Sequence, residues 1–204
     1  MNYDEIISTA LGMSDRGDDP ELPSKMDGFL RIVEARANRK LGIRSQSKRA
    51  YIYTVQDRDT YCLPPDFSGM RHIALKSSEV DTGTSMTLVS PDEMVVRINS
   101  NSFEPVYTIV ENSIMVWPRP GDMVIEIMYY QRILPLTTTN NSNWLSVLHP
   151  DVYLFGLMVE ISAWAKDSET AKDWDGRFQT SLGEVDDEDQ RDRWSGSPLA
   201  MRIE

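Results

Sequence analysis

The sequence contains a single cysteine, Cys62, and only two histidines, His72 and His149, among its 204 residues. One cysteine excludes an intrachain disulfide and any zinc site built from several thiolates. The two histidines lie far apart, without a Cys, His or Asp cluster at metal-ligand spacing, so each is interpreted as a structural residue. We therefore expect no metal site, and a reducing compartment is the default expectation.

Glycine-rich phosphate loops and long apolar runs are also absent. Gly69, Gly83 and Gly121 stand singly, which excludes Walker-type and dinucleotide-binding patterns. No stretch approaches the roughly 20 apolar residues that a membrane-spanning helix needs. Residues 1–11 carry Asp4 and Glu5 and lack the apolar core of a signal peptide. We expect no nucleotide cofactor, no membrane insertion and no secretion.

Acidic residues are in excess, with 32 Asp and Glu against 21 Lys and Arg and a formal net charge of −11. Proteins that bind nucleic acid neutralise phosphates with a basic patch, so this charge argues against a nucleic-acid-binding protein. An acidic wall repels phosphate, which suits a surface that DNA slides past. The length fits one compact domain that buries roughly 70% of the area exposed in the unfolded chain.

Apolar residues recur at helical spacing near both ends of the chain. The spacing predicts a helix over residues 23–41, preceded by a shorter amphipathic helix over residues 3–11. Near the other end it predicts a helical hairpin, with one helix over 150–165 and a second over 169–184. The charged run at 186–189 and the glycine and proline that follow predict that this helix ends there.

Between the helices the sequence changes to short β-rich runs bounded by turn residues. The pair Glu111-Asn112 is typical of a hairpin turn, and Ser90 followed by Pro91 is typical of the start of a helical turn. The strands that this pattern predicts are residues 51–55, 70–76, 106–110, 114–117 and 123–133.

The order of helices, strands and helices predicts an α+β fold. In it, the N-terminal helix and the C-terminal helical hairpin pack together, and an antiparallel β-sheet is inserted between them. We expect one domain over residues 1–189, with helices within 3–41 and 150–185 and a β-rich insertion over 50–134. Residues 190–204 are predicted to form an extended C-terminal arm.

Catalytic chemistry has weak support in the sequence. With 32 acidic residues, a carboxylate pair for glycoside hydrolysis can always be found. Glu111, Glu126 and Asp151 fall near predicted strand or helix ends, but acidic residues also cover any solvated surface. Cys62, among Tyr, Leu and Pro residues, is interpreted as a buried apolar thiol. We expect no catalytic residue and no cofactor.

Candidate partner-binding residues lie in the hairpin and the C-terminal arm. Tyr153 and Phe155 flank the apolar stripe of the first hairpin helix and fit either the core or a contact with a neighbouring subunit. In the arm, apolar residues stand in a polar segment, as in an arm that orders on binding; a frayed terminus is the alternative. The candidate interface residues are Tyr153, Phe155, Trp194, Leu199, Met201 and Ile203.

A series of motifs runs through residues 22–186 in a fixed order. The series includes Tyr61-Cys62-Leu63-Pro64-Pro65, Trp117-Pro118-Arg119-Pro120 and His149-Pro150-Asp151, together with residues 29–41, 89–93, 105–109, 128–131 and 143–145. It resembles the series found in the head-to-tail connector adaptors of tailed phages, in particular the short-tailed phages.

The resemblance implies a structural virion protein without enzymatic activity. It implies a homo-oligomeric ring, usually of about twelve copies, that connects the portal protein to tail or nozzle proteins. DNA would pass through the channel of this ring without specific binding. The implied location is the head-to-tail junction of the virion, after assembly in the host cytoplasm. Two other functions stay open: a virion-associated glycan hydrolase with a carboxylate pair, and a monomeric binding module.

Overall fold

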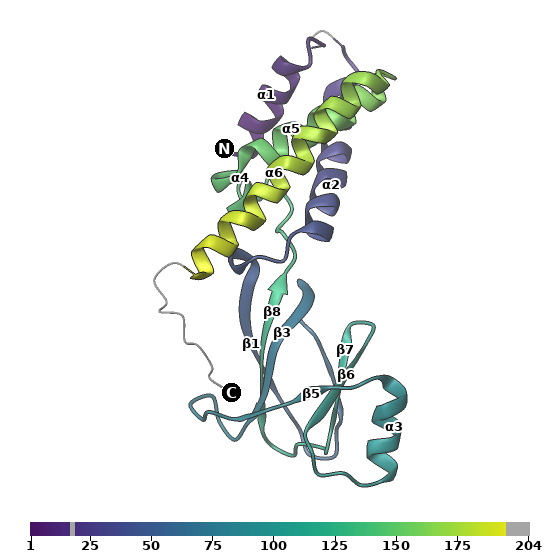
Figure 1. Cartoon of the computed structure of the whole chain (residues 1–204), viewed down its shortest axis with the longest axis vertical. Coiled ribbons are helices and arrows are strands. Elements are labelled where there is room, and N and C mark those ends of the chain that lie inside the picture. The colour runs from purple at the N-terminus through teal and green to yellow at the C-terminus, as the bar shows by residue number, and fades with distance from the viewer. Residues whose placement is uncertain (17–18, 195–204) are drawn as a thin grey trace. The chain divides into compact units, whose positions relative to one another are not determined.

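The computed structural model describes residues 1–16 and 19–194 and divides into two compact units. The helical unit comprises Met1–Ser45 and Ile133–Glu204, and the β unit comprises Gln46–Arg132 (Figure 1). The β unit is therefore an insertion between two segments that fold together, as the order of predicted elements requires.

Five α-helices build the described part of the helical unit, and local signals fix where they start. The side chain of Asn2 accepts the N–H of Glu5, whose carboxylate accepts the N–H of Asn2, and this capping box opens α1. Asn143 opens α4 in the same way with Ser146. Lys166, at φ 61°, lies in the turn between α5 and α6. The helices are α1 (Tyr3–Met13), α2 (Leu22–Lys40), α4 (Trp144–Leu148), α5 (Pro150–Trp164) and α6 (Ser168–Trp194).

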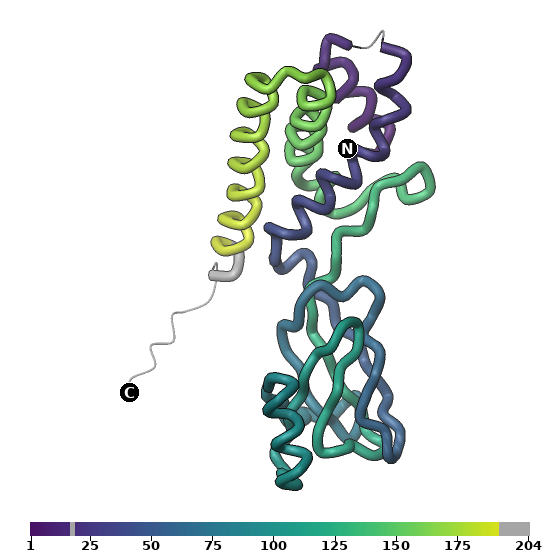
Figure 2. The backbone as a smooth tube through the Cα atoms, turned by 90° about the vertical axis from the view of Figure 1, so that its right-hand side faces the viewer, coloured from purple at the N-terminus to yellow at the C-terminus, as the bar shows by residue number. Residues whose placement is uncertain are grey.

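The core of the helical unit surrounds α5. This helix is apolar on nearly all sides, as is typical of a helix covered by neighbours in every direction. It contacts α1, α2, α4 and α6, and α6 forms one outer layer (Figure 2). The largest side chains without exposed area in this core include Leu22, Tyr153, Phe178 and Ile6.

The β unit contains two four-stranded sheets. Their strand orders are β1-β8-β3-β4 and β2-β7-β6-β5, and every pair is antiparallel except β5 with β6. The strands are β1 (Ser47–Tyr53), β2 (Thr60–Cys62), β3 (Phe67–Lys76), β4 (Thr84–Ser85), β5 (Thr87–Leu88), β6 (Val106–Val110), β7 (Ser113–Trp117) and β8 (Val124–Gln131).

The two sheets share one apolar core. Alternate residues of β8, namely Ile125, Ile127 and Tyr129, enter it from one sheet, and Ile114 and Val116 of β7 enter it from the other. This period of two fixes the register, since a slip by one residue would turn the whole apolar set outward. Helix α3 (Pro91–Asn99) contacts β6 and β7 and is capped by the Ser90 hydroxyl.

The predicted α+β class is confirmed, whereas the C-terminal boundary differs. Helix α6 continues through the acidic run to Trp194, because Leu182, Val185 and Asp189 extend its buried stripe. The backbone N–H of Arg44 donates to Asp189 Oδ1 at 2.8 Å, which ties this last part of α6 to the unit. Residues 190–194 of the predicted arm are thus helical, and residues 195–204 lie outside the described residues.

Gly156 allows α5 to approach α2 closely. A Cβ at this position would lie 2.6 and 2.9 Å from the two methyl carbons of Val33 and 3.1 Å from the ring of Phe178. These distances are too short for atoms of a packed core, so the helix-weakening glycine is required here for packing.

We predict that Gly156→Ala lowers the free energy of unfolding by about 1–3 kcal/mol, the usual cost of overpacking a core. Chemical denaturation monitored by circular dichroism measures the change. Gly12→Ala in α1 is the matched control, because a Cβ there meets nothing within 4 Å. The control should be neutral or stabilising by up to about 1 kcal/mol. Equal stability of the two variants would contradict the packing role of Gly156.

Candidate functional site

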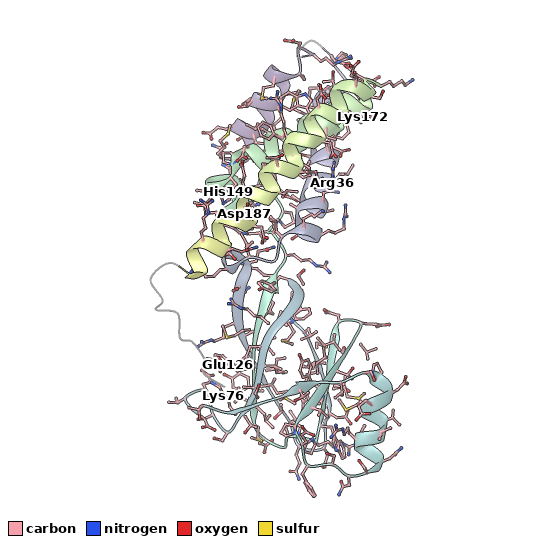
Figure 3. All side chains as sticks on the ribbon, in the orientation of Figure 1. Arg36, Lys76, Glu126, His149, Lys172 and Asp187 are labelled. Atoms are coloured by element: carbon pink, nitrogen blue, oxygen red, sulfur yellow. The ribbon has the colours of Figure 1, made fainter. Side chains whose placement is uncertain are left out.

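The three carboxylates that the sequence suggested for hydrolysis lie in unrelated settings. Glu111 is exposed in the β6–β7 turn at φ 55°, and Asp151 stands in the first turn of α5, in the helical unit. Glu126 is buried on β8, where Arg49 Nε lies 3.0 Å from its Oε1 and Lys76 pairs with its Oε2 (Figure 3). The hydrogen bond from Lys76 lowers the pKa of Glu126. Glu126 is therefore held by two basic side chains as a charged structural group.

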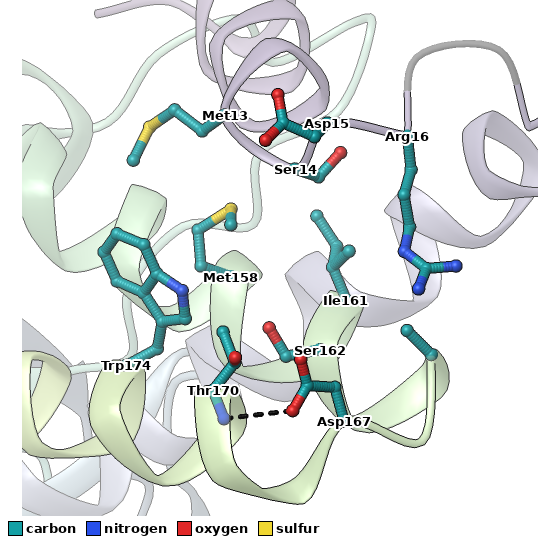
Figure 4. Close-up of a pocket in the computed structure, with 11 residues that line it drawn as sticks. Met13, Ser14, Asp15, Arg16, Met158, Ile161, Ser162, Asp167, Thr170 and Trp174 are labelled. Atoms are coloured by element: carbon teal, nitrogen blue, oxygen red, sulfur yellow. Dashed lines mark hydrogen bonds between the residues drawn. The ribbon is translucent and has the colours of Figure 1, made fainter.

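A pocket of about 270 Å³ lies where the end of α1 meets α5 and the start of α6 (Figure 4). Met158 and Trp174 form part of its apolar wall, and Arg16 lies at its edge. Asp167 accepts the N–H of Thr170 at 3.2 Å, and hydrogen bonds from Thr170 lower the pKa of this carboxyl. The carboxylate of Asp167 thus caps the first turn of α6.

No metal centre is formed by the residues that the structure describes. Among the side chains that the structure describes, those of residues 1–16 and 19–191, no group of three or more His, Cys, Asp or Glu could hold a metal ion. His149 lies between α4 and α5, edge-on to Trp144 and with Nδ1 3.9 Å from the carboxylate of Glu188.

Cys62 differs from its sequence-based interpretation, and Tyr153 takes one of the two roles that the sequence left open for it. Cys62 is exposed, because the alternation along β2 turns Tyr61 inward and its neighbour outward. Tyr153, a candidate interface residue, has no exposed area, so within this subunit it belongs to the core. The position of Tyr153 beside the apolar stripe could not reveal its burial, since α5 is covered by neighbours on nearly all sides.

The hydroxyl of Tyr153 belongs to a buried polar network. It donates to Glu34 Oε1 at 3.2 Å and accepts from Asn143 Nδ2 at 2.7 Å. The same carboxylate oxygen accepts the N–H of Leu136 at 2.7 Å. Burial raises the pKa of Glu34, and the hydrogen bonds from Leu136 and Tyr153 oppose that rise. The network joins α2, α5 and the segment that returns from the β unit.

A second polar link joins the three long helices. The guanidinium of Arg36 on α2 lies over the ring of Phe178 at 4.7 Å and pairs with Asp175 of α6 (Figure 3). Its other nitrogen lies 3.4 Å from Glu160 of α5. Because the guanidinium is shared by carboxylates from two helices, it orients α5 and α6 relative to α2.

Phe155 lines a shallow groove of about 380 Å³ between α5 and α6. It is half-buried, and its ring centroid lies 5.8 Å from that of Trp174. Gly176, Thr180 and Glu184 of α6 continue the groove. Phe155 therefore both packs against the core and borders a surface groove, which keeps it a candidate contact residue.

The remaining candidate interface residues are at the C-terminal end. Trp194 is the last residue of α6. Leu199, Met201 and Ile203 lie outside the described residues. Their role stays a prediction from the sequence.

Exposed apolar side chains in segment 88–103 of the β unit are a surface that the sequence did not reveal. Phe103 is 83% exposed, Leu88 61%, and Val95 and Val96 of α3 each 56%. Only Met94 of α3 is classed as buried. The apolar pair Val95-Val96 was the available signal for this surface. However, the apolar spacing in a helix of only nine residues does not show which apolar residues face the core.

In the described parts of the chain, no helix combines the length and the apolar character needed to cross a membrane. The model of one protein family, described as SU10 adaptor protein, matches residues 1–202. No curated protein matches the chain.

We predict that Glu34→Gln reduces the fall in stability between mildly acidic and mildly alkaline pH. Because burial raises the pKa of Glu34, the folded protein keeps this proton to higher pH than the unfolded chain does. Its contribution to stability is full below the unfolded pKa and is lost as pH rises through the folded pKa. Glutamine keeps the acceptor oxygen for Leu136 and Tyr153 and does not titrate. Urea titrations across the pH range measure the effect.

Tyr153→Phe is the control for this prediction. It removes one partner of Glu34 and retains the carboxyl group, so the pH dependence should persist at a lower stability. An unchanged pH dependence in Glu34→Gln would show that Glu34 does not titrate differently in the folded protein.

Proposed function

The chain belongs to the SU10 adaptor protein family, and on that premise we propose that it is one subunit of a ring that joins the portal of a phage head to the tail. Family membership makes it a structural adaptor of a phage. The family match, which extends over residues 1–202, is the observation that carries the proposal. The motif order along residues 22–186 supports the same assignment from the sequence.

In this proposal the protein is a component of the virion at the head-to-tail junction, assembled in the host cytoplasm. About twelve copies form a closed ring by repeating one heterologous contact. The net charge of −11 per copy supports a channel wall that phosphates do not adhere to, so that DNA passes without specific binding.

We assign ring building to the helical unit and the contact with tail or nozzle proteins to the β unit. The exposed apolar side chains in segment 88–103 support the second assignment, since apolar side chains that are grouped on a surface are typical of partner-binding sites. We assign the contact with the portal protein to residues 195–204, where Leu199, Met201 and Ile203 alternate with other residues as in a segment added to a sheet edge.

We predict that the purified chain changes mass only in the presence of its portal. Mixing it with the portal protein of the same genome should give a complex that carries about one copy per portal subunit. Light scattering coupled to size exclusion measures the mass before and after mixing. A chain that stays monomeric and separate from the portal would contradict the proposed function and favour a binding module.

We predict that replacing Leu199, Met201 and Ile203 by Ser reduces portal binding at least tenfold and leaves the fold unchanged. The apolar anchors are lost, while all described helices and strands lie before residue 195. Sedimentation of the chain with portal rings measures binding, and circular dichroism reports the fold. Ala200→Ser with Arg202→Ser is the matched control and should bind normally. Equal binding by both variants would remove this segment from the portal contact.

A further inference from the structure

One face of α2 is exposed, basic and contains small residues. Asp27 at its border is the acidic exception. The face is exposed although α2 buries its opposite side in the core, from Leu22 to Ala37. We call this set the basic face of α2: Lys25, Gly28, Arg31, Ile32, Ala35 and Arg39.

The outer side of α6 has the opposite charge. Its exposed residues from 179 to 190 include acidic side chains and no basic one. Lys172 (Figure 3) and Arg177 lie nearer its start, and Arg177 is stacked over Trp174 at 4.7 Å. We call the following set the acidic face of α6: Asp173, Gly176, Thr180, Gly183, Glu184 and Asp187.

Charges on both faces lack partners within the subunit. Among the side chains of residues 1–16 and 19–191, no ion pair within 4.0 Å involves Lys25, Arg39, Asp173 or Asp187. Ile32, on the basic face, is 44% exposed. Each face is therefore available to an oppositely charged helix.

The glycines of the two faces have no packing reason within the subunit. A Cβ at Gly28, Gly176 or Gly183 would meet nothing within 4 Å, unlike one at Gly156. Glycine in the middle of a helix weakens the helix, and it permits close approach of another backbone. These three glycines therefore leave room for another backbone to approach from outside the subunit.

The two faces also match in spacing. On α2, Gly28, Ala35 and Arg39 follow Lys25 by three, ten and fourteen residues. On α6, the residues at the same intervals after Asp173 are Gly176, Gly183 and Asp187. At about 1.5 Å per residue, both pairs of outer charges are about 21 Å apart. A parallel pairing of the helices thus aligns both charge pairs and both pairs of small residues.

The placement of the helices permits this pairing between copies. Both α2 and α6 run from the end of the unit that holds the α1–α2 and α5–α6 connections toward its other end (Figure 1). Both contact α5, and Arg36 of α2 also contacts Asp175 and Phe178 of α6. A rotation about an axis that follows the helices keeps their directions, so α2 of one copy and α6 of the next run parallel.

We propose that the basic face of α2 in one copy docks along the acidic face of α6 in a second copy, in the register that pairs Lys25 with Asp173 and Arg39 with Asp187. The inference rests on the proposed ring and names the contact that builds it. Because each copy carries both faces, the contact repeats from copy to copy and closes into a ring. Salt weakens it, since the paired charges lie at its rim.

Charge reversal on one face at a time tests the contact. The α2 variant is Lys25→Glu with Arg39→Glu, and the α6 variant is Asp173→Lys with Asp187→Lys. Either variant alone, mixed with portal rings, should associate at least tenfold more weakly than the natural chain. An equimolar mixture of the two should recover, because each altered face then meets an altered partner in an alternating ring. Normal assembly of either variant alone, or no recovery in the mixture, would overturn the proposal.

A second pair of variants does not depend on charge. Gly176→Leu should fold with equal or higher thermal stability, because a Cβ there meets nothing within 4 Å and leucine favours helix more than glycine does. It should block ring formation by holding the helices apart. Gly12→Leu in α1 is the control, since it is as open within the subunit, and should assemble normally. Assembly by both variants would contradict close helix approach.

The outcomes separate this inference from the proposed function. If the natural chain forms no multi-copy complex with its portal, the proposed function itself fails. If the natural chain assembles and the face variants assemble equally well, only the assignment of the contact fails. Analytical ultracentrifugation at low and moderate salt measures all of these complexes.

Discussion

The buried carboxylate of Glu34 is the constraint on which the helical unit depends. A carboxylate is among the most costly groups to bury, so it is found in a core only where hydrogen-bond donors contact it. The donors are the N–H of Leu136 and the hydroxyl of Tyr153, from two different parts of the chain. Asn38 adds a further bond by accepting the N–H of Ile133. The bonds from Leu136 and Ile133 hold the segment that returns from the β unit against α2. The bond from Tyr153 to Glu34 holds α5 against α2 as well.

The fold class was predictable because its signals are local. Helical spacing, Asn and Pro at helix starts and the Glu111-Asn112 turn each act within a few residues. The short strands β2, β4 and β5 were not predictable, because two or three residues carry no period of their own. Burial of Tyr153 was not predictable either, since it follows from which helices cover α5. When a helix is apolar on several sides, the sequence does not identify a single face that packs in the core.

The C-terminal half of α6 shows how packing overrides a local signal. Four consecutive acidic residues at 186–189 read as the end of a helix, yet the helix passes through them. Val185 and Asp189 face inward in the stripe begun by Phe178 and Leu182, while Asp187 and Glu188 remain in solvent. The tertiary contacts outweigh the repulsion between neighbouring carboxylates. The acidic residues 186–189, which led to a wrong prediction of the helix end, also contribute to the negative charge of the outer face of α6.

The way the chain enters and leaves the β unit has a consequence for how such proteins diversify. Strands β1 and β8 pair along their whole length, with Ser47 opposite Tyr130, so entry and exit lie side by side. Because the two connections to the helical unit are adjacent, an inserted unit of this kind can be lengthened, exchanged or recombined without changing the distance between them. The helical unit would then be inherited as a stable frame, and the β unit would vary with the partner it must fit.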